Sequence, residues 1–310
     1  MIDSFVRGMK RSQNEEDSYS INKLFCDKHN NLCKGLHYFY YSNMKNRVKS
    51  YQTIWSFIIQ NKKELDKGHE LEEHYVSLSE QYAYLLFNND QVVTLEEKLK
   101  PNNDDIFLMT YFTYNLILSA KSILDVFAWI IKEAFLTNVA LKPSQVSIIF
   151  KDYRRADKNK HESFKKACED NLDAKLYEYL CSDGIQSVFS NLEKHRDIVS
   201  HKGKIHIMVH DNRNTGKVNI VKPKDPELLR TIEFGEAHKE PGGKDEFEAC
   251  SQFANGIIAN LDSLFVKIND SVLRHLQMLG LSKELAKTTK NTDKWNKLKQ
   301  EIDKIDCRID

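Results

Sequence analysis

Glycine and proline are scarce in this sequence, with 11 glycines and 5 prolines among 310 residues. A fold made of many short strands needs these residues at its tight turns, so their scarcity argues against an all-β protein. The long segments with apolar periodicity favour helices instead. With 41% hydrophobic and 10% aromatic residues, the chain can bury a sizeable core. We therefore predict a mainly α fold.

Cysteines in close pairs are also lacking. The six cysteines form neither a CxxC pair nor a dense disulfide framework, and they are Cys26, Cys33, Cys168, Cys181, Cys250 and Cys307. Reduced thiols are the simplest expectation. His206 and His210 stand four apart on a predicted strand, but no third ligand of suitable spacing follows them. We therefore expect no metal site and no cofactor.

No secretory signal or membrane span is recognisable. Residues 1 to 20 are polar and charged and contain no apolar secretory core. The most apolar stretch, Ile106 to Leu136, is interrupted by Asn115, Lys121, Asp125 and Lys132. We expect a cytoplasmic protein with no membrane partner.

A large excess of positive charge is absent as well, because the formal net charge is only +1. No overall field then attracts nucleic acid, and any RNA contact must come from local basic patches. One patch surrounds residues 194 to 204 and supplies four candidate RNA-binding residues, Lys194, His195, Lys202 and Lys204. A second basic stretch, residues 151 to 166, is interpreted as a solvated loop and helix face.

The most informative segment is residues 196 to 201, Arg-Asp-Ile-Val-Ser-His. Apolar residues in and before this segment are spaced three to four apart, which predicts an amphipathic helix. They are Ile185, Val188, Phe189, Leu192 and Ile198. Gly203 stands where that helix would stop. Arg196 is a permanent cation with a planar fork of donors for phosphate oxygens, and His201 can give or take a proton near neutral pH. RNA cleavage without a metal needs these two groups.

Arg196 and His201 converge within one chain only under a geometric condition. Residues five apart lie about 140° from each other around an ideal helix, so the helix would have to end between them. A two-fold dimer would remove this requirement, since two helix ends could then pool their groups in one cleft. The other interpretation is structural, with Arg196 pairing with an acid such as Glu193 while His201 caps the helix.

An arginine, an adjacent polar residue and a histidine after four intervening residues resemble the conserved element of HEPN domains, a family of helical proteins. The segment from Tyr111 to Phe135 is similar to the long first helix of such bundles. The resemblance covers roughly residues 105 to 275. It implies that Arg196 and His201 are the catalytic pair and that Asp197 is the polar neighbour.

The HEPN resemblance implies a metal-independent endoribonuclease and a homodimer. It also implies a toxin or antiviral defence effector that acts on RNA, with a protein partner or antitoxin as a possible regulator. Asp125 is a further auxiliary candidate, although it and Lys121 stand four apart and can simply form an ion pair on a helix surface. The alternative is a non-catalytic HEPN-like module that binds a nucleotide or a protein.

The predicted organisation begins with a flexible leader at residues 1–22 and an N-terminal helical region at 23–100. That region contains a helical hairpin formed by Leu36 to Gln60 and Leu71 to Phe87. Breaks follow at Asn88-Asn89-Asp90 and at residues 101–105. Asp104 or Asp105 could cap the next helix. A HEPN-like bundle follows at 105–280, with a small β-hairpin at about 204–222 and a closing helix from Phe247 to Leu279. Residues 281–310 are predicted to form a charged C-terminal helix.

Overall fold

The computed structural model shows a mainly α protein, as the sequence predicts. The residues that the structure describes are 39–40, 42–97, 103–137, 166–202, 207–212, 217–224, 247–288, 290 and 292–306. At residues 200–202, 208–212, 217–221, 223, 247 and 306 only the backbone is described. The predicted leader, residues 1–22, lies outside the described residues.

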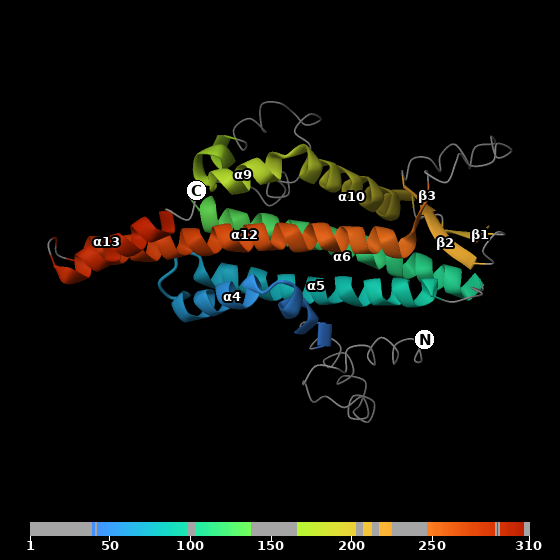
Figure 1. The fold of residues 1–310 in the computed structure, drawn as a ribbon, viewed down its shortest axis with the longest axis horizontal. Coiled ribbons are helices and arrows are strands. Elements are labelled where there is room, and N and C mark those ends of the chain that lie inside the picture. The colour runs from blue at the N-terminus through green and yellow to red at the C-terminus, as the bar shows by residue number, and fades with distance from the viewer. Residues whose placement is uncertain are drawn as a thin grey trace, which may run out of the picture. The chain divides into compact units, whose positions relative to one another are not determined.

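The labelled helices and strands are drawn in Figure 1. The helices are α4 (Ser50–Asn61), α5 (Gly68–Glu96), α6 (Asn103–Phe135), α9 (Ala174–Cys181), α10 (Asp183–Lys202), α12 (Cys250–Lys287) and α13 (Asp293–Asp306). The strands are β1 (Met208–Asn212), β2 (Lys217–Pro223) and β3 (Phe247–Ala249). Residues 42–47 and 166–171 are also helical.

The chain divides into two compact units. Unit 1 comprises Met1–Asn46, Ser79–Ile123 and Ser187–Leu261, and unit 2 comprises Arg47–Leu78, Leu124–Gln186 and Asp262–Asp310. Both units therefore draw on each of the two predicted regions, 23–100 and 105–280. Neither unit is one continuous segment, because four long helices, α5, α6, α10 and α12, contribute residues to both.

The core of unit 2 is centred on aromatic rings from four helices. The Tyr51 ring of α4 lies 6.0 Å from the Tyr75 ring of α5 and 5.9 Å from the Phe265 ring of α12, between ring centroids. The Phe127 ring of α6 lies 5.2 Å from that of Phe265. The buried Tyr75 hydroxyl donates a 2.9 Å hydrogen bond to Asn269 Oδ1, so its polar end is satisfied. The aromatic N-terminal segment thus supplies core residues.

The sheet belongs to unit 1, where α10 ends and α12 begins (Figure 1). β1 and β2 form the antiparallel hairpin that the sequence predicts, with Met208 opposite Val221 and Asn212 opposite Lys217. β3 pairs antiparallel with β2 and makes the strand order β1-β2-β3. The prediction that the closing helix begins at Phe247 is wrong, because backbone pairing with β2 holds residues 247–249 in a strand.

The helical hairpin near the N-terminus differs from the prediction at two breaks. The predicted single helix from Leu36 to Gln60 is interrupted at Val48 and Lys49, which allows both Val48 and Tyr51 to be fully buried. The predicted break at 88–90 is wrong, since α5 continues to Glu96. Asn88 donates to the Tyr84 carbonyl oxygen at 2.8 Å, and this bond within the helix offsets the turn preference of asparagine.

α6 supplies core residues to both units. It begins at Asn103, so Asp104 and Asp105 lie in its first turn rather than at its cap, where the helix dipole still favours their charge. By length and composition, α6 is the one described helix that could span a membrane. The sequence predicts no span here, because polar and charged residues interrupt this stretch. Core helices meet the same criteria. The nine residues of α6 that are fully buried against the protein are Met109, Leu116, Ile117, Ala120, Ile123, Phe127, Ala128, Ile130 and Ile131.

α12 confirms the apolar stripe predicted for the closing helix. All seven residues of that stripe are buried: Phe253, Ile257, Leu261, Leu264, Ile268, Val272 and Leu276. The helix spans Cys250–Lys287 and so continues beyond its predicted end, although its buried face ends at Leu276. The predicted C-terminal helix is correspondingly shorter, since α13 spans Asp293–Asp306 and buries Leu298.

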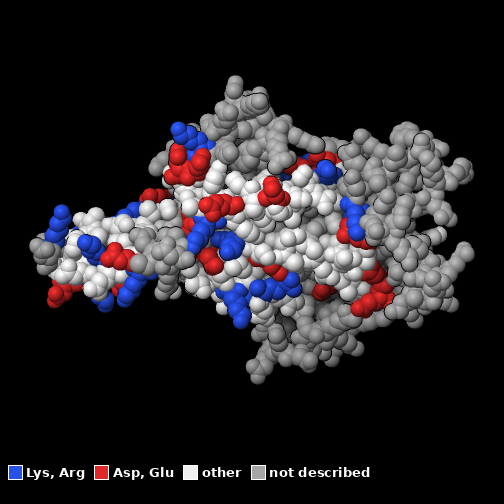
Figure 2. Space-filling model, turned by 45° about the horizontal axis from the view of Figure 1, so that its top comes forward, with Lys and Arg blue, Asp and Glu red and all other residues white. Residues whose placement is uncertain are grey.

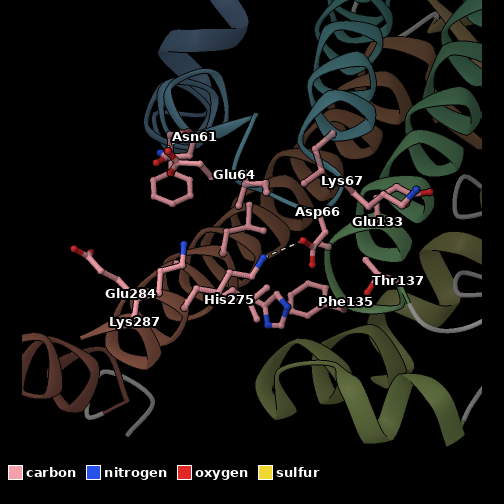
Figure 3. A pocket seen from close by; sticks show the side chains of 18 of the residues that line it. Asn61, Glu64, Asp66, Lys67, Glu133, Phe135, Thr137, His275, Glu284 and Lys287 are labelled. Atoms are coloured by element: carbon pink, nitrogen blue, oxygen red, sulfur yellow. Dashed lines mark hydrogen bonds and ion pairs between the residues drawn. The ribbon is translucent and has the colours of Figure 1, made fainter. Parts of the chain in front are cut away.

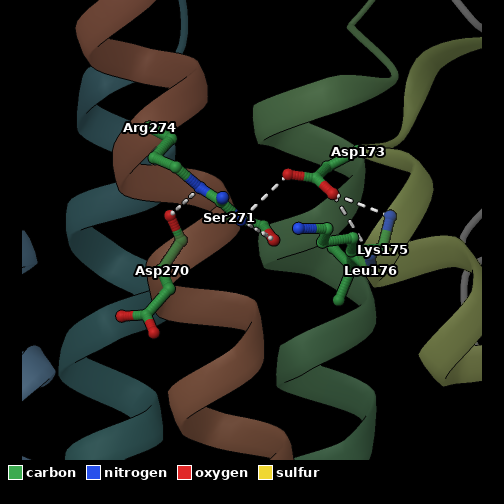
Figure 4. A network of polar contacts seen from close by, with 6 residues as sticks. All are labelled: Asp173, Lys175, Leu176, Asp270, Ser271 and Arg274. Atoms are coloured by element: carbon green, nitrogen blue, oxygen red, sulfur yellow. Dashed lines mark hydrogen bonds and ion pairs between the residues drawn. The ribbon is translucent and has the colours of Figure 1, made fainter. Parts of the chain in front are cut away.

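Asp173 connects the start of α9 to α12 in unit 2 (Figure 4). As the N-cap of α9, its Oδ1 accepts hydrogen bonds from the backbone N–H groups of Lys175 at 2.9 Å and Leu176 at 3.3 Å. Its Oδ2 lies 2.9 Å from Arg274 Nη2, and both side chains are largely buried. One carboxylate therefore satisfies a helix terminus and neutralises a cation of another helix.

Replacing Asp173 with alanine should lower the free energy of unfolding by roughly 1–3 kcal/mol, because the cap and the ion pair are lost together. Asp173→Asn keeps an acceptor for the cap and should cost less. Urea denaturation followed by circular dichroism measures the difference. The assignment fails if Asp173→Ala is no less stable than Asp170→Ala, which changes an aspartate outside this network.

Alkaline pH should destabilise the fold through the buried Cys250 thiol. Burial raises its pKa from 9.0 to about 12, and the nearby Glu96 carboxylate adds to the rise. Between these values the unfolded chain releases the thiol proton and the folded chain keeps it. The free energy of unfolding therefore falls as pH rises from about 9 to about 12. Below about pH 9 the stabilisation that the protonated thiol contributes is fully present.

Cys250→Ala should make that fall shallower by about 1.4 kcal/mol per pH unit, measured by urea denaturation across the alkaline range. Ala254→Gly weakens the same helix without removing a titrating group, so it should keep the steep pH dependence. A Cys250→Ala slope equal to that of the parent would show that the thiol is not responsible.

Candidate functional site

α10 carries the Arg-x4-His motif in its last two turns and ends one residue before Gly203, as predicted. Its backbone is helical without interruption through residues 196 to 202. The condition for convergence within one chain, a helix that ends between Arg196 and His201, is therefore not met. On a continuous helix the two residues point about 140° apart.

Arg196 is 29% exposed and already has two acidic neighbours on its own helix. Its Nη1 lies 3.0 Å from Asp197 Oδ1, and its Nη2 lies 3.6 Å from Glu193 Oε1. The ion pair with Glu193 that the structural interpretation expected is thus present. Such partly exposed pairs are weak, so a phosphate could compete for the remaining donors of the guanidinium.

The prediction that His195 lies on an RNA-binding surface is wrong, because this residue is only 2% exposed. Its Nδ1 lies 2.8 Å from the Asn191 carbonyl oxygen, and its Nε2 lies 3.2 Å from Lys222 Nζ. Lys222 is fully buried, with its Nζ 2.8 Å from Glu248 Oε1 and 3.8 Å from the centre of the Phe253 ring. The imidazole is therefore part of the core of unit 1 and cannot contact RNA there.

The other predicted site residues are placed as follows. Lys194 is exposed on α10, as an RNA-binding residue would be. Only the backbone of His201 and Lys202 is described, and Lys204 lies outside the described residues. Asp125 is partly exposed on α6 and belongs to unit 2, whereas Arg196 belongs to unit 1. Arg196, Asp197 and Lys194 are thus together on α10, and Asp125 is not in their unit.

Acidic and basic side chains are mixed on the face of the molecule in Figure 2. Lys and Arg there lie beside Asp and Glu instead of forming one continuous basic surface. This agrees with the formal net charge of +1. On this face, the described residues therefore produce no broad electropositive field.

Unit 2 contains a pocket of about 960 Å³ that the sequence did not predict (Figure 3). The turn before α5, the end of α6 and the second half of α12 form its walls. Its charged groups include Lys283, whose Nζ lies 2.9 Å from Asp66 Oδ1. The ring of Phe135 lies 4.6 Å from that of His275, between centroids, and burial lowers the pKa of His275. The pocket thus combines a neutral imidazole and an aromatic surface with lysines and carboxylates.

The sequence pattern did not identify Lys222 as a partner of His195 on α10, or Glu248 as the partner of Lys222. The alternation of β2 offered a partial signal, since Lys222 shares a strand face with Val218 and Ile220. A lysine at an apolar position of a strand indicates either an edge or a buried charge. Nothing in the pattern identifies His195, 27 residues earlier, as its partner.

Comparison of the chain with protein-family models, with curated proteins and with solved structures finds no match.

Proposed function

We propose that this protein is a metal-independent endoribonuclease of the HEPN type, with Arg196 and His201 as its catalytic residues. The observation that carries the proposal is the position of both residues in the last turns of α10, within a mainly α protein. The C-terminal end of a helix favours an imidazolium, which suits a residue that donates a proton to a leaving oxygen.

The proposed reaction is an internal transfer on RNA. The ribose 2′-oxygen attacks the adjacent phosphorus and forms a new P–O bond, while the bond from phosphorus to the 5′-oxygen breaks. His201 takes the proton from the 2′-hydroxyl, and the imidazolium so formed gives a proton to the departing 5′-oxygen. Arg196 stabilises the charge on the non-bridging oxygens, and Asp197 holds its guanidinium. The products are a 2′,3′-cyclic phosphate and a 5′-hydroxyl.

The active cleft in this proposal is shared by two copies of the chain. Continuous helical backbone from Arg196 to His201 supports this, because positions five apart on an ideal helix lie about 140° from each other. In a two-fold dimer the arginine of one helix end and the histidine of the other can face the same phosphate. Lys194, and the basic residues Lys202 and Lys204, would contact the RNA backbone beside the cleft.

The biological role that we propose is that of a cytoplasmic toxin or antiviral defence effector that cuts transfer RNA, messenger RNA or phage RNA. This part of the proposal depends on the resemblance of the motif to HEPN ribonucleases. A nuclease that acts on cellular RNA needs control, so a protein partner or antitoxin is a natural companion.

Cleavage of total RNA by the purified protein should continue in EDTA, because the proposed chemistry uses a cation and a proton carrier from the protein. Products should carry cyclic phosphate ends, detected by their resistance to ligation until a phosphatase able to open cyclic ends has acted. Activity that disappears in EDTA and returns with magnesium or manganese would contradict the mechanism.

The second candidate function is a non-catalytic module that binds a nucleotide. The pocket of unit 2 favours it, because an aromatic ring, a neutral imidazole and lysines are the groups that contact a base and its phosphates. Calorimetric titration with ATP and GTP measures such binding. Saturable binding that is lost in His275→Ala, together with no RNA cleavage, would favour this function over the nuclease.

A further inference from the structure

The buried ammonium of Lys222 is an unusual feature of the core of unit 1. An apolar side chain of similar volume would avoid the desolvation that a buried charge entails. Burial lowers the pKa of Lys222, while Glu248 acts in the opposite direction. The position of the ammonium between Glu248 and the Phe253 ring compensates in part for its removal from water. The cost of burying this charge indicates a role other than stability.

The contact with His195 defines the state of that imidazole. A carbonyl oxygen only accepts hydrogen bonds, so His195 Nδ1 donates to the Asn191 carbonyl oxygen. An ammonium only donates, so Nε2 accepts from Lys222 Nζ. The imidazole is therefore neutral with its proton on Nδ1. Its ring also packs on Phe253 of α12, 4.8 Å between centroids.

This contact lies on the buried face of α10, which also carries Leu192, Ile198 and Val199. Arg196 follows His195 by one residue and lies about 100° to one side of it on an ideal helix. His201 follows by six residues and lies about 120° to the other side. With His195 on the buried face, positions 196 and 201 of an ideal helix therefore fall on opposite flanks of it.

We propose that Lys222, held by Glu248, is a positioning residue that fixes the rotation of α10 through His195 and so directs Arg196 and His201 into the shared cleft. This inference rests on the proposed nuclease function for its effect on catalysis. Its structural part, the fixing of the last two turns of α10, is independent of any activity. The sheet then has a function of its own, because β2 and β3 carry Lys222 and Glu248 to the catalytic helix.

The test compares Lys222→Met with Lys224→Met. Both remove a lysine from the same stretch of chain, but Lys224 is exposed and outside the network. In Lys222→Met, hydrogen exchange of the amides of residues 196–202 should become at least about tenfold faster, since the helix end loses its anchor. At equal folded fraction, kcat for RNA cleavage should fall by about tenfold while KM changes by less than about twofold. Lys224→Met should match the parent in both measurements.

Three further variants separate positioning from stability. Lys222→Met combined with Glu248→Leu replaces the ion pair with apolar groups, which should restore much of the stability. If the network positions α10, kcat stays low and exchange stays fast in this double variant. His195→Gln places an acceptor near the Nε2 position and should recover more activity than His195→Leu, which offers none.

Equal exchange at residues 196–202 in Lys222→Met and Lys224→Met would overturn the inference. So would a double variant that regains kcat and slow exchange together with stability, because the network would then serve stability alone. A parent protein that does not cleave RNA would refute the proposed function. In that case the exchange measurements alone still decide whether Lys222 fixes α10.

Discussion

Arg196→Ala and His201→Ala are each expected to reduce RNA cleavage by at least about a hundredfold. Loss of Arg196 removes charge stabilisation from the non-bridging oxygens, and loss of His201 removes proton transfer. Each of these effects commonly changes a rate by about a hundredfold or more. The folded state should change little, because the ion pairs of Arg196 are partly exposed and contribute less than about 1 kcal/mol. Initial rates on a labelled RNA, at equal folded fraction, provide the measurement.

Matched controls exist for both substitutions. Arg47 is a surface arginine that also forms an ion pair, with Asp262 Oδ2 at 2.6 Å, and Arg47→Ala should leave cleavage unchanged. His69 is an exposed histidine on α5, and His69→Ala should likewise have no effect. If Arg196→Ala and His201→Ala cut RNA as fast as these controls, the assignment of the catalytic pair is wrong.

Mixing the two inactive variants should restore cleavage to about one quarter of the parent rate. Random exchange of subunits makes about half of the dimers mixed, and each mixed dimer has one cleft with an intact arginine and an intact histidine from different chains. This expectation follows from the uninterrupted helix between Arg196 and His201. The measurement is the cleavage rate after co-refolding Arg196→Ala with His201→Ala.

The mass in solution must be measured in the same samples. A dimer that gives no complementation would mean that each cleft uses both groups from both chains. An active protein that is monomeric at every concentration would contradict the shared cleft. The side chains of Arg196 and His201 would then have to meet within one chain, which an ideal helix with residues about 140° apart does not allow.

The sequence by itself determined the features that depend on local periodicity. The stripe on α12 was predicted correctly because burial at intervals of three and four residues is the property that makes an amphipathic helix stable. The end of α10 beside Gly203 and the β1–β2 hairpin follow from helix-stop and turn composition. Each of these depends on residues that are near one another in the chain.

Only the tertiary structure decided which polar residues are buried and what they contact. His195 has the same local context as the exposed Lys194, yet it meets Lys222 from 27 residues later in the core of unit 1. α5 passes through Asn88-Asn89-Asp90 because Asp90 accepts a 2.9 Å hydrogen bond from the distant Tyr40 hydroxyl and Asn88 bonds within the helix. β3 is a strand because β2 offers an unpaired edge. In each case a partner far away in sequence offsets the local preference, and periodicity contains no information about that partner.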